Sequence, residues 1–140
     1  MDNVGIMVED LKAAIAFFTE LGLEVEGETT VEGQWVDDVV GLDDVRSDIA
    51  VMRTPDGGCK LELSQFQKPK LISTEQNVPV NTQGLHRIMF AVEDIDEVVA
   101  RLEAHGATLI GKVTQYENIY RLCYMRGPEG IVVALAQKIG

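Results

Sequence analysis

Hydrophobic and polar residues follow the same order of periods in the two halves of the chain. Residues 4–8 and residues 88–92 alternate between apolar and other side chains, as a half-buried β-strand does. Apolar residues then recur at the i, i+3, i+4 and i+7 spacing of an amphipathic helix. These stripes are Leu11, Ala14, Ile15 and Phe18 in the first half, and Ile95, Val98, Val99 and Leu102 in the second. Each half is therefore predicted to begin with a strand and an amphipathic helix.

The two predicted helices have matching end signals. Asp10 and Asp94 stand where an N-cap is expected, and Gly22 and Gly106 stand where the chain needs a left-handed residue. Three strand-like runs follow each helix. They lie near Leu23–Thr30, Ile49–Arg53 and Cys59–Gln65 in the first half, and near Thr108–Gln115, Ile119–Arg126 and Ile131–Gln137 in the second.

The two halves match as copies of one unit. Val8-Glu9-Asp10-Leu11 corresponds to Val92-Glu93-Asp94-Ile95, and each copy later has a Pro-acid-Gly turn, at 55–57 and at 128–130. We therefore predict an α+β fold of two βαβββ modules, residues 1–65 and 85–140, joined by a linker at 66–84. The modules are expected to form one domain, residues 1–140, paired around a pseudo-twofold axis. Helices would then lie outside, and curved mixed sheets would form a cleft.

Composition and charge narrow the classes of partner. The formal net charge of -11 argues against nucleic acid, because phosphate binding needs an excess of Lys and Arg. No apolar run approaches the length of about 18 residues typical of a membrane span, and no signal peptide is visible, so a cytoplasmic protein is expected. Cys59 and Cys123 lack metal-ligand spacing and are predicted to be buried. The acidic stretch 32–48 is predicted to be a solvated loop.

Strand alternation places a mixed set of small and polar side chains on the face away from the helices. This open face is predicted to carry Asn3, Gly5, Met7, Lys60, Glu62, Ser64, Arg87, Met89, Ala91, Val132, Ala134 and Ala136. Further candidates for a ligand-binding cleft are Trp35, Tyr116, Tyr120, Arg121 and Tyr124. For Tyr120 and Tyr124, stacking on a ligand and ordinary core packing are both open interpretations.

The runs Asp2–Leu11 and Phe90–Asp96, together with the Gly127–Gly130 turn, resemble the vicinal oxygen chelate superfamily. That superfamily includes glyoxalase I, bleomycin-resistance proteins, extradiol dioxygenases and methylmalonyl-CoA epimerase. The resemblance covers nearly the whole chain. It implies a cleft for a small organic molecule, a homodimer by analogy with relatives, and metal ligands, commonly His and Glu or Gln, from the first and last strands of each module. Those four positions hold Asn3, Glu62, Arg87 and Ala134.

The residues at these four positions differ from the usual ligands of a metal site. Arg87 stays protonated and has no lone pair, and Ala134 has no donor atom, so no cofactor is predicted. A divalent metal could bind only if Glu62 and Asn3 were sufficient as its protein ligands. His86 adjoins Arg87, but strand alternation would place it on the opposite face. His105 is expected in the last helical turn.

Two hypotheses about chemistry follow. In the first, Glu62 and Arg87 form an ion pair, with Asn3 adding a hydrogen bond, and the protein binds a small organic molecule without metal. Its binding residues would be Asn3, Met7, Glu62, Arg87, Met89, Tyr120 and Tyr124. In the second, the protein is a lyase, isomerase or dioxygenase in which Glu62 is the general base or a ligand, and Arg87 holds an anionic substrate. Separate solvation of Glu62 and Arg87, and a purely structural interaction module, also stay open.

Overall fold

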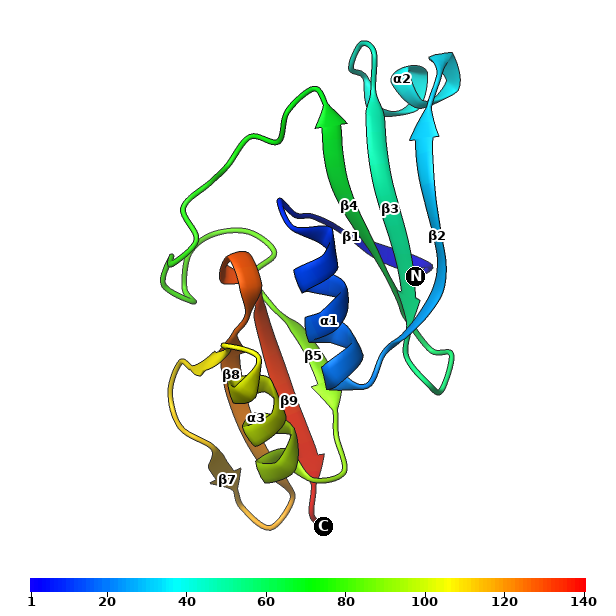
Figure 1. The fold of residues 1–140 in the computed structure, drawn as a ribbon. Coiled ribbons are helices and arrows are strands. Elements are labelled where there is room, and N and C mark those ends of the chain that lie inside the picture. Colours follow the sequence, from blue (N-terminus) through cyan, green and yellow to red (C-terminus); the bar gives the residue numbers. More distant parts are fainter. The chain divides into compact units, whose positions relative to one another are not determined.

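Each half of the chain has the predicted strand and helix at its beginning and strands after them, which confirms the α+β fold class (Figure 1). The computed structural model describes residues 1–140, divided into the units Met1–Thr74 and Glu75–Gly140. The first unit contains β1 (Asn3–Met7), α1 (Leu11–Leu21), β2 (Glu24–Glu32), α2 (Gln34–Val40), β3 (Arg46–Arg53) and β4 (Lys60–Lys68). The second contains β5 (Ile88–Ala91), α3 (Ile95–Ala104), β6 (Thr108–Leu109), β7 (Thr114–Tyr116), β8 (Tyr120–Arg126), a 3-10 turn (Pro128–Gly130) and β9 (Val132–Lys138).

Both sheets are mixed and have the same strand order. The first sheet has the order β1-β4-β3-β2, and the second has β5-β9-β8-β6, with β7 also paired to β8. In each unit the first strand runs parallel to the last, and the other pairs are antiparallel. Val4 lies opposite Leu61, and at the equivalent place Ile88 lies opposite Val133. The repeat therefore extends to the register of the parallel pair.

The core of each unit lies between its sheet and its helix. Helix α1 contacts β2, β3 and β4, and α3 contacts β8 and β9. The predicted stripe of α3 is buried at all four positions. In α1 the stripe is shifted, because Phe17 is buried where Ile15 was predicted and Ile15 is only half-buried. The Phe17 and Phe18 rings meet edge to face, with centroids 5.2 Å apart. None of the helices is long and apolar enough to span a membrane.

The predicted caps are present at both helices. The Asp10 carboxylate accepts a hydrogen bond from the Ala13 N–H at 3.0 Å, and the Asp94 carboxylate accepts one from the Glu97 N–H at 3.1 Å. After the helices, Gly22 and Gly106 adopt φ values of 117° and 88°, where a side chain would be strained. These local signals explain why the helix boundaries could be predicted.

A second cap, absent from the sequence prediction, ties each helix to the last strand of its unit. The side-chain carbonyl of Gln65 on β4 accepts the Leu11 N–H at 3.0 Å. Gln137 on β9 accepts the Ile95 N–H in the same way, at 2.9 Å. The first N–H groups of a helix have no partner inside the helix, so these glutamines satisfy donors that would otherwise be half-buried and unpaired.

The segment between β2 and β3 differs from the prediction of a solvated acidic loop. It contains α2, whose Val36 is buried while Trp35 and Val39 are exposed. The Asp37 carboxylate accepts the Asp44 N–H at 3.0 Å and the Val45 N–H at 2.8 Å. This acidic side chain therefore organises the turn that leads into β3.

Two strand boundaries and the burial of one cysteine also differ from the prediction. The single strand expected at Thr108–Gln115 is divided into β6 and β7, with Gly111 in the gap between them. Strand β4 continues to Lys68, into the beginning of the expected linker. Cys59, expected to be buried, is half-buried, whereas Cys123 is buried as predicted.

An arginine holds part of the chain before β5 against the second unit. Arg126 donates hydrogen bonds to the carbonyls of Gln76 at 3.1 Å, Val78 at 2.9 Å and Gly130 at 3.4 Å. Gly130 has a φ of 80°, and a Cβ placed there would collide with the Gln76 carbonyl oxygen. We call residues 76–80 the strap segment. Its position depends on the hydrogen bonds from Arg126 and on the absence of a Cβ atom at Gly130.

Removing the glutamine acceptor should destabilise the protein. Gln137→Ala leaves the Ile95 N–H without its partner, so we expect the free energy of unfolding to fall by about 1–2 kcal/mol, measured by urea denaturation. Gln67→Ala is the control, because its exposed side chain only donates to Asp48 at 3.0 Å. Equal midpoints for the two variants would show that water replaces the glutamine carbonyl.

A side chain at Gly130 should release the strap segment. Gly130→Ala places a Cβ against the Gln76 carbonyl in left-handed backbone, which costs about 1–2 kcal/mol from conformation alone. We expect lower backbone order parameters at residues 76–78, measured by ¹⁵N relaxation, because the Gln76 and Val78 carbonyls lose their place beside Arg126. Gly111→Ala serves as the control, because no atom lies within 4 Å of its added Cβ. Unchanged order parameters in Gly130→Ala would contradict this role.

Candidate functional site

Strand β1 presents its open-face residues as predicted. Asn3, Gly5 and Met7 are exposed, whereas the alternate residues are half-buried. Gly5 lies opposite Glu62 of β4 in the parallel register, and Asn3 lies opposite Lys60. A Cβ added to Gly5 would have only the Met7 methyl group within 4 Å, at 3.8 Å. The half-buried Glu62 therefore has open space on one side.

The cations near this face are already paired. Lys60 forms an ion pair with Glu26 at 3.0 Å, and Arg53 forms one with Glu24, also at 3.0 Å. Glu62 takes part in neither pair. The Asn3 amide donates to the adjacent Asp2 carboxylate at 2.9 Å. The first unit therefore offers a carboxylate without a cationic partner of its own unit.

The second unit has a different set of side chains in the equivalent row. Met89 of β5, Ala134 of β9 and Tyr124 of β8 are direct neighbours across three strands. Ala134 is fully buried, and Tyr124 is half-buried. Arg87 directly precedes β5, and its guanidinium carbon lies 5.0 Å from the centre of the Tyr124 ring. This distance is typical of a cation–π contact.

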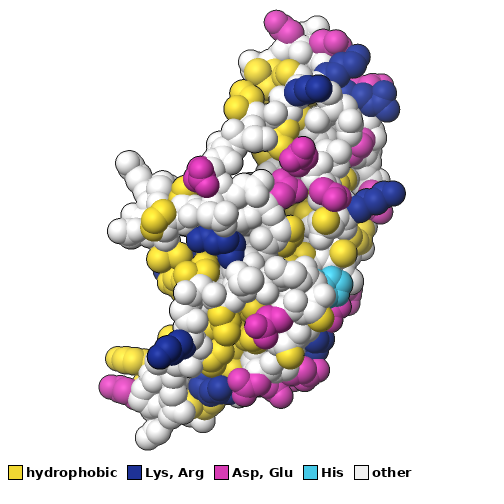
Figure 2. All heavy atoms as spheres, turned by 60° about the vertical axis from the view of Figure 1, so that its left-hand side comes forward, with side chains coloured by type: hydrophobic (Ala, Val, Ile, Leu, Met, Phe, Trp, Pro, Cys, Tyr) yellow, Lys and Arg dark blue, Asp and Glu magenta, His cyan; other side chains and the backbone are white.

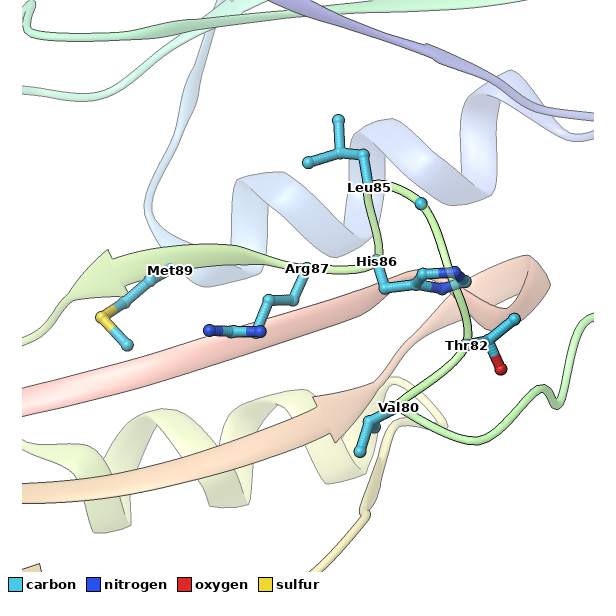
Figure 3. Close-up of a pocket in the computed structure, with 7 residues that line it drawn as sticks. Val80, Thr82, Leu85, His86, Arg87 and Met89 are labelled. Atoms are coloured by element: carbon cyan, nitrogen blue, oxygen red, sulfur yellow. The ribbon is translucent and has the colours of Figure 1, made fainter.

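Arg87 also borders an open hollow of about 450 Å³. The hollow is lined by Val80, Thr82, Gly84, Leu85, His86, Arg87 and Met89, most of which Figure 3 labels. No acidic side chain is among them. Leu85 is 79% exposed and Met89 is 54% exposed, so apolar surface lies beside the cation.

His86 is predicted to point away from Arg87. Both residues directly precede β5 and line the same hollow. Figure 3 shows the two side chains extending in opposite directions, with Arg87 running towards Met89. The His86 Nε2 lies 2.9 Å from the Gln83 carbonyl, which can only accept. Nε2 therefore carries a hydrogen, and Nδ1 is the free ring nitrogen.

The prediction that Arg121 lines a cleft is wrong. Arg121 donates two hydrogen bonds to the Asp96 carboxylate of α3, at 2.8 and 3.0 Å, and therefore points to the helix side of its sheet. These hydrogen bonds lower the pKa of Asp96. Among the aromatic candidates, Trp35 is on α2 and Tyr116 is on β7, while Tyr120 shares the open face of β8 with Tyr124.

The other shifted pKa values belong to structural groups. Burial raises the pKa of the Cys123 thiol, which makes it a poor nucleophile at neutral pH. The Asp56 carboxyl has a lowered pKa because it accepts hydrogen bonds from the Thr54 hydroxyl at 2.6 Å and the Gly58 N–H at 2.9 Å. Asp56 thus shapes the predicted Pro-Asp-Gly turn.

The residues at the four implied ligand positions do not fit a divalent cation. Arg87 has hydrogen-bond donors but no lone pair for a metal, and the Ala134 side chain has no polar atom. Glu62 is the one position with a charged ligand. In neither unit do three or more His, Cys, Asp or Glu side chains gather as around a metal ion. The predicted ion pair between Glu62 and Arg87 joins residues of different units and stays a prediction.

Sequence reasoning missed the walls of the hollow. Val80 and Thr82 fall within the expected linker, and Leu85 is the first residue after it, where no period marks them. The only available signal was the presence of single apolar residues in a polar segment.

Comparisons with known proteins agree with this fold. Residues 2–124 match the model of the Glyoxalase/Bleomycin resistance protein/Dioxygenase superfamily. A glyoxalase family protein from Bacillus cereus is 54% identical, with 100% of this chain and 94% of that chain covered and a TM-score of 0.96. A glyoxalase family protein from Enterococcus faecalis is 19% identical over 98% of this chain and 96% of that chain, with a TM-score of 0.66.

The trypanothione-dependent glyoxalase I of Leishmania major is 20% identical over 96% of this chain and 84% of its own, with a TM-score of 0.68. At this identity, it and the Enterococcus protein show a shared fold. No curated protein matches the chain. The family model and the Bacillus cereus relative together show that this chain belongs to the glyoxalase/bleomycin resistance protein/dioxygenase superfamily.

Proposed function

We propose that this protein binds a small organic molecule on the open faces of its sheets without a divalent metal. The observation that carries the proposal is Arg87, which stands at an implied ligand position and lies over the Tyr124 ring. A guanidinium stays charged and has no lone pair, so it repels a cation and attracts an anion. The binding residues would be Asn3, Met7, Glu62, Arg87, Met89, Tyr120 and Tyr124.

The composition of the two faces supports binding of an organic ligand. Met7 and Met89 are about half exposed, and Tyr120 is 39% exposed, so flexible apolar groups and a ring are available for contact. Side chains of this kind adapt to apolar and aromatic ligand surfaces. The polar groups beside them are few, which is typical of small-molecule sites.

Metal analysis tests this proposal directly. We expect purified protein to contain far less than one equivalent of transition metal. Added Ni, Zn, Mn, Fe or Co should leave the melting temperature unchanged, because an ion that does not bind the folded state cannot stabilise it. Arg87→His replaces the cation with a lone-pair donor and should increase metal affinity. A stoichiometric metal in the wild-type protein that disappears in Glu62→Gln would contradict the proposal.

A second candidate function is proton transfer by Glu62 on a bound carbonyl compound. It is favoured by the space that Gly5 leaves beside the half-buried Glu62 carboxylate. A positioned carboxylate contributes about 10²–10⁴-fold to such a step. Proton abstraction by Glu62 needs direct contact between its carboxylate and the substrate, and it needs no metal ion.

Exchange of substrate protons for deuterium tests this candidate. If Glu62 is a general base, Glu62→Gln should slow protein-dependent exchange at the α-carbon of a bound ketone or keto acid by at least about 10²-fold, measured by NMR in D₂O. The ligand affinity should stay within a few-fold. Equal exchange rates for the wild type and Glu62→Gln would exclude Glu62 as the base.

A further inference from the structure

Arg87 is the one arginine of the second unit without an oxygen acceptor of its own unit. The other three are each bound to such an acceptor: Arg101 to Glu97 at 2.7 Å, Arg121 to Asp96 at 2.8 Å and Arg126 to the Val78 carbonyl at 2.9 Å. The protein has a formal net charge of -11, and Figure 2 shows acidic side chains spread over the face that it draws. On this acidic protein, the hollow beside Arg87 is lined by a cation and by no carboxylate.

The contact with Tyr124 orients the Arg87 guanidinium. The ring lies 5.0 Å from the guanidinium carbon, so the attraction acts through the π face of tyrosine and does not use a hydrogen-bond acceptor. The N–H donors of Arg87 then remain free for a planar anion. A carboxylate matches two of these donors at once, and such charge-assisted pairs are stronger than neutral hydrogen bonds.

The other groups that line the hollow are apolar or already hydrogen-bonded. Thr82 donates its hydroxyl hydrogen to the Pro79 carbonyl at 2.6 Å, and His86 bonds the Gln83 carbonyl through Nε2 at 2.9 Å. Val80, Leu85 and Met89 are all more than 40% exposed. Exposed apolar side chains gathered around a concave site favour contact with an apolar ligand body.

The strap segment gives this hollow a defined wall. Val80 is the last residue of the strap segment and lines the hollow. Arg126 holds the strap segment by its hydrogen bonds to the Gln76 and Val78 carbonyls. The fixed wall reduces the ordering that a ligand would otherwise have to impose on this part of the chain. The hollow, about 450 Å³, lies within the size range of small-molecule sites.

We propose that this hollow binds an organic carboxylate with an aromatic body, anchored by Arg87 and packed against Leu85 and Met89. The inference rests on the proposed function, since it names the chemical class of the small molecule. The ligand carboxylate occupies the in-plane donors of Arg87, and the ring of the ligand covers apolar surface that is otherwise in water.

Calorimetric titration of the full chain with three probes tests this assignment. Benzoate has both the charge and the ring, benzamide keeps the ring without the charge, and acetate keeps the charge without the ring. We expect benzoate to bind at least about tenfold more tightly than either of the others, because benzamide cannot form the charge-assisted hydrogen bonds to Arg87 and acetate has no ring to cover apolar surface. Benzoate affinity should also fall as salt is added.

Matched variants identify the anchor. Arg87→Gln should weaken benzoate at least tenfold and leave benzamide unchanged, whereas Arg53→Gln removes an exposed arginine of the first unit and should change neither. Tyr124→Phe keeps the ring and should preserve benzoate binding. Tyr124→Leu should weaken it. Circular dichroism and thermal unfolding verify that each variant is folded.

The outcomes separate this inference from the proposed function. Equal affinity for benzoate and benzamide, or benzoate binding that is unchanged in Arg87→Gln, would overturn the assignment of a carboxylate while leaving a metal-free binding site. Failure of all three probes to bind metal-free protein would overturn the assignment as well. A stoichiometric metal held by Glu62 in the wild-type protein would instead overturn the proposed function.

Discussion

The parallel pairing of the first strand of each unit with its last strand is the constraint on which the rest of the structure depends. Parallel neighbours cannot be joined by a tight turn, so the intervening chain must leave the sheet and return, and the helix covers one face as it does so. The register is the same in both units, Val4 opposite Leu61 and Ile88 opposite Val133. This shared register decides which side chains stand in one row on the open face.

The glutamine caps connect this pairing to the helices. Gln65 and Gln137 are on the last strand of their units, and each accepts the first N–H of the helix that follows the first strand. A short, directional contact thus joins three elements that are far apart in sequence. Because the donor is a helix-terminal N–H without an internal partner, losing the acceptor affects both the helix and its position over the sheet.

The parts of the fold that could be predicted have local signals that occur twice. The strand alternation and the Asp caps depend on residues within one turn or a few positions of each other, and the repeat confirms each signal with a second copy. Helix α2 was missed because seven residues are too few to show a helical period. The contacts of Arg126 with the Gln76 and Val78 carbonyls, which are 50 and 48 residues away, have no local pattern at all. The alternation of β1 was therefore predictable, but the contacts of Arg126 and the strap segment were not.

Equivalent positions in the two units have diverged in charge as well as in size. The row of Gly5 and Glu62 in the first unit corresponds to the row of Met89 and Ala134 in the second, so a carboxylate with space beside it is replaced by an exposed methionine and a buried alanine. Arg87 then adds a cation where the first unit has a neutral amide. A metal site requires lone-pair donors at several of these positions, whereas recognition of an organic molecule requires a few polar groups among apolar ones. The second unit has the latter composition, so the fold keeps the same row of positions in both units while the side chains in that row differ.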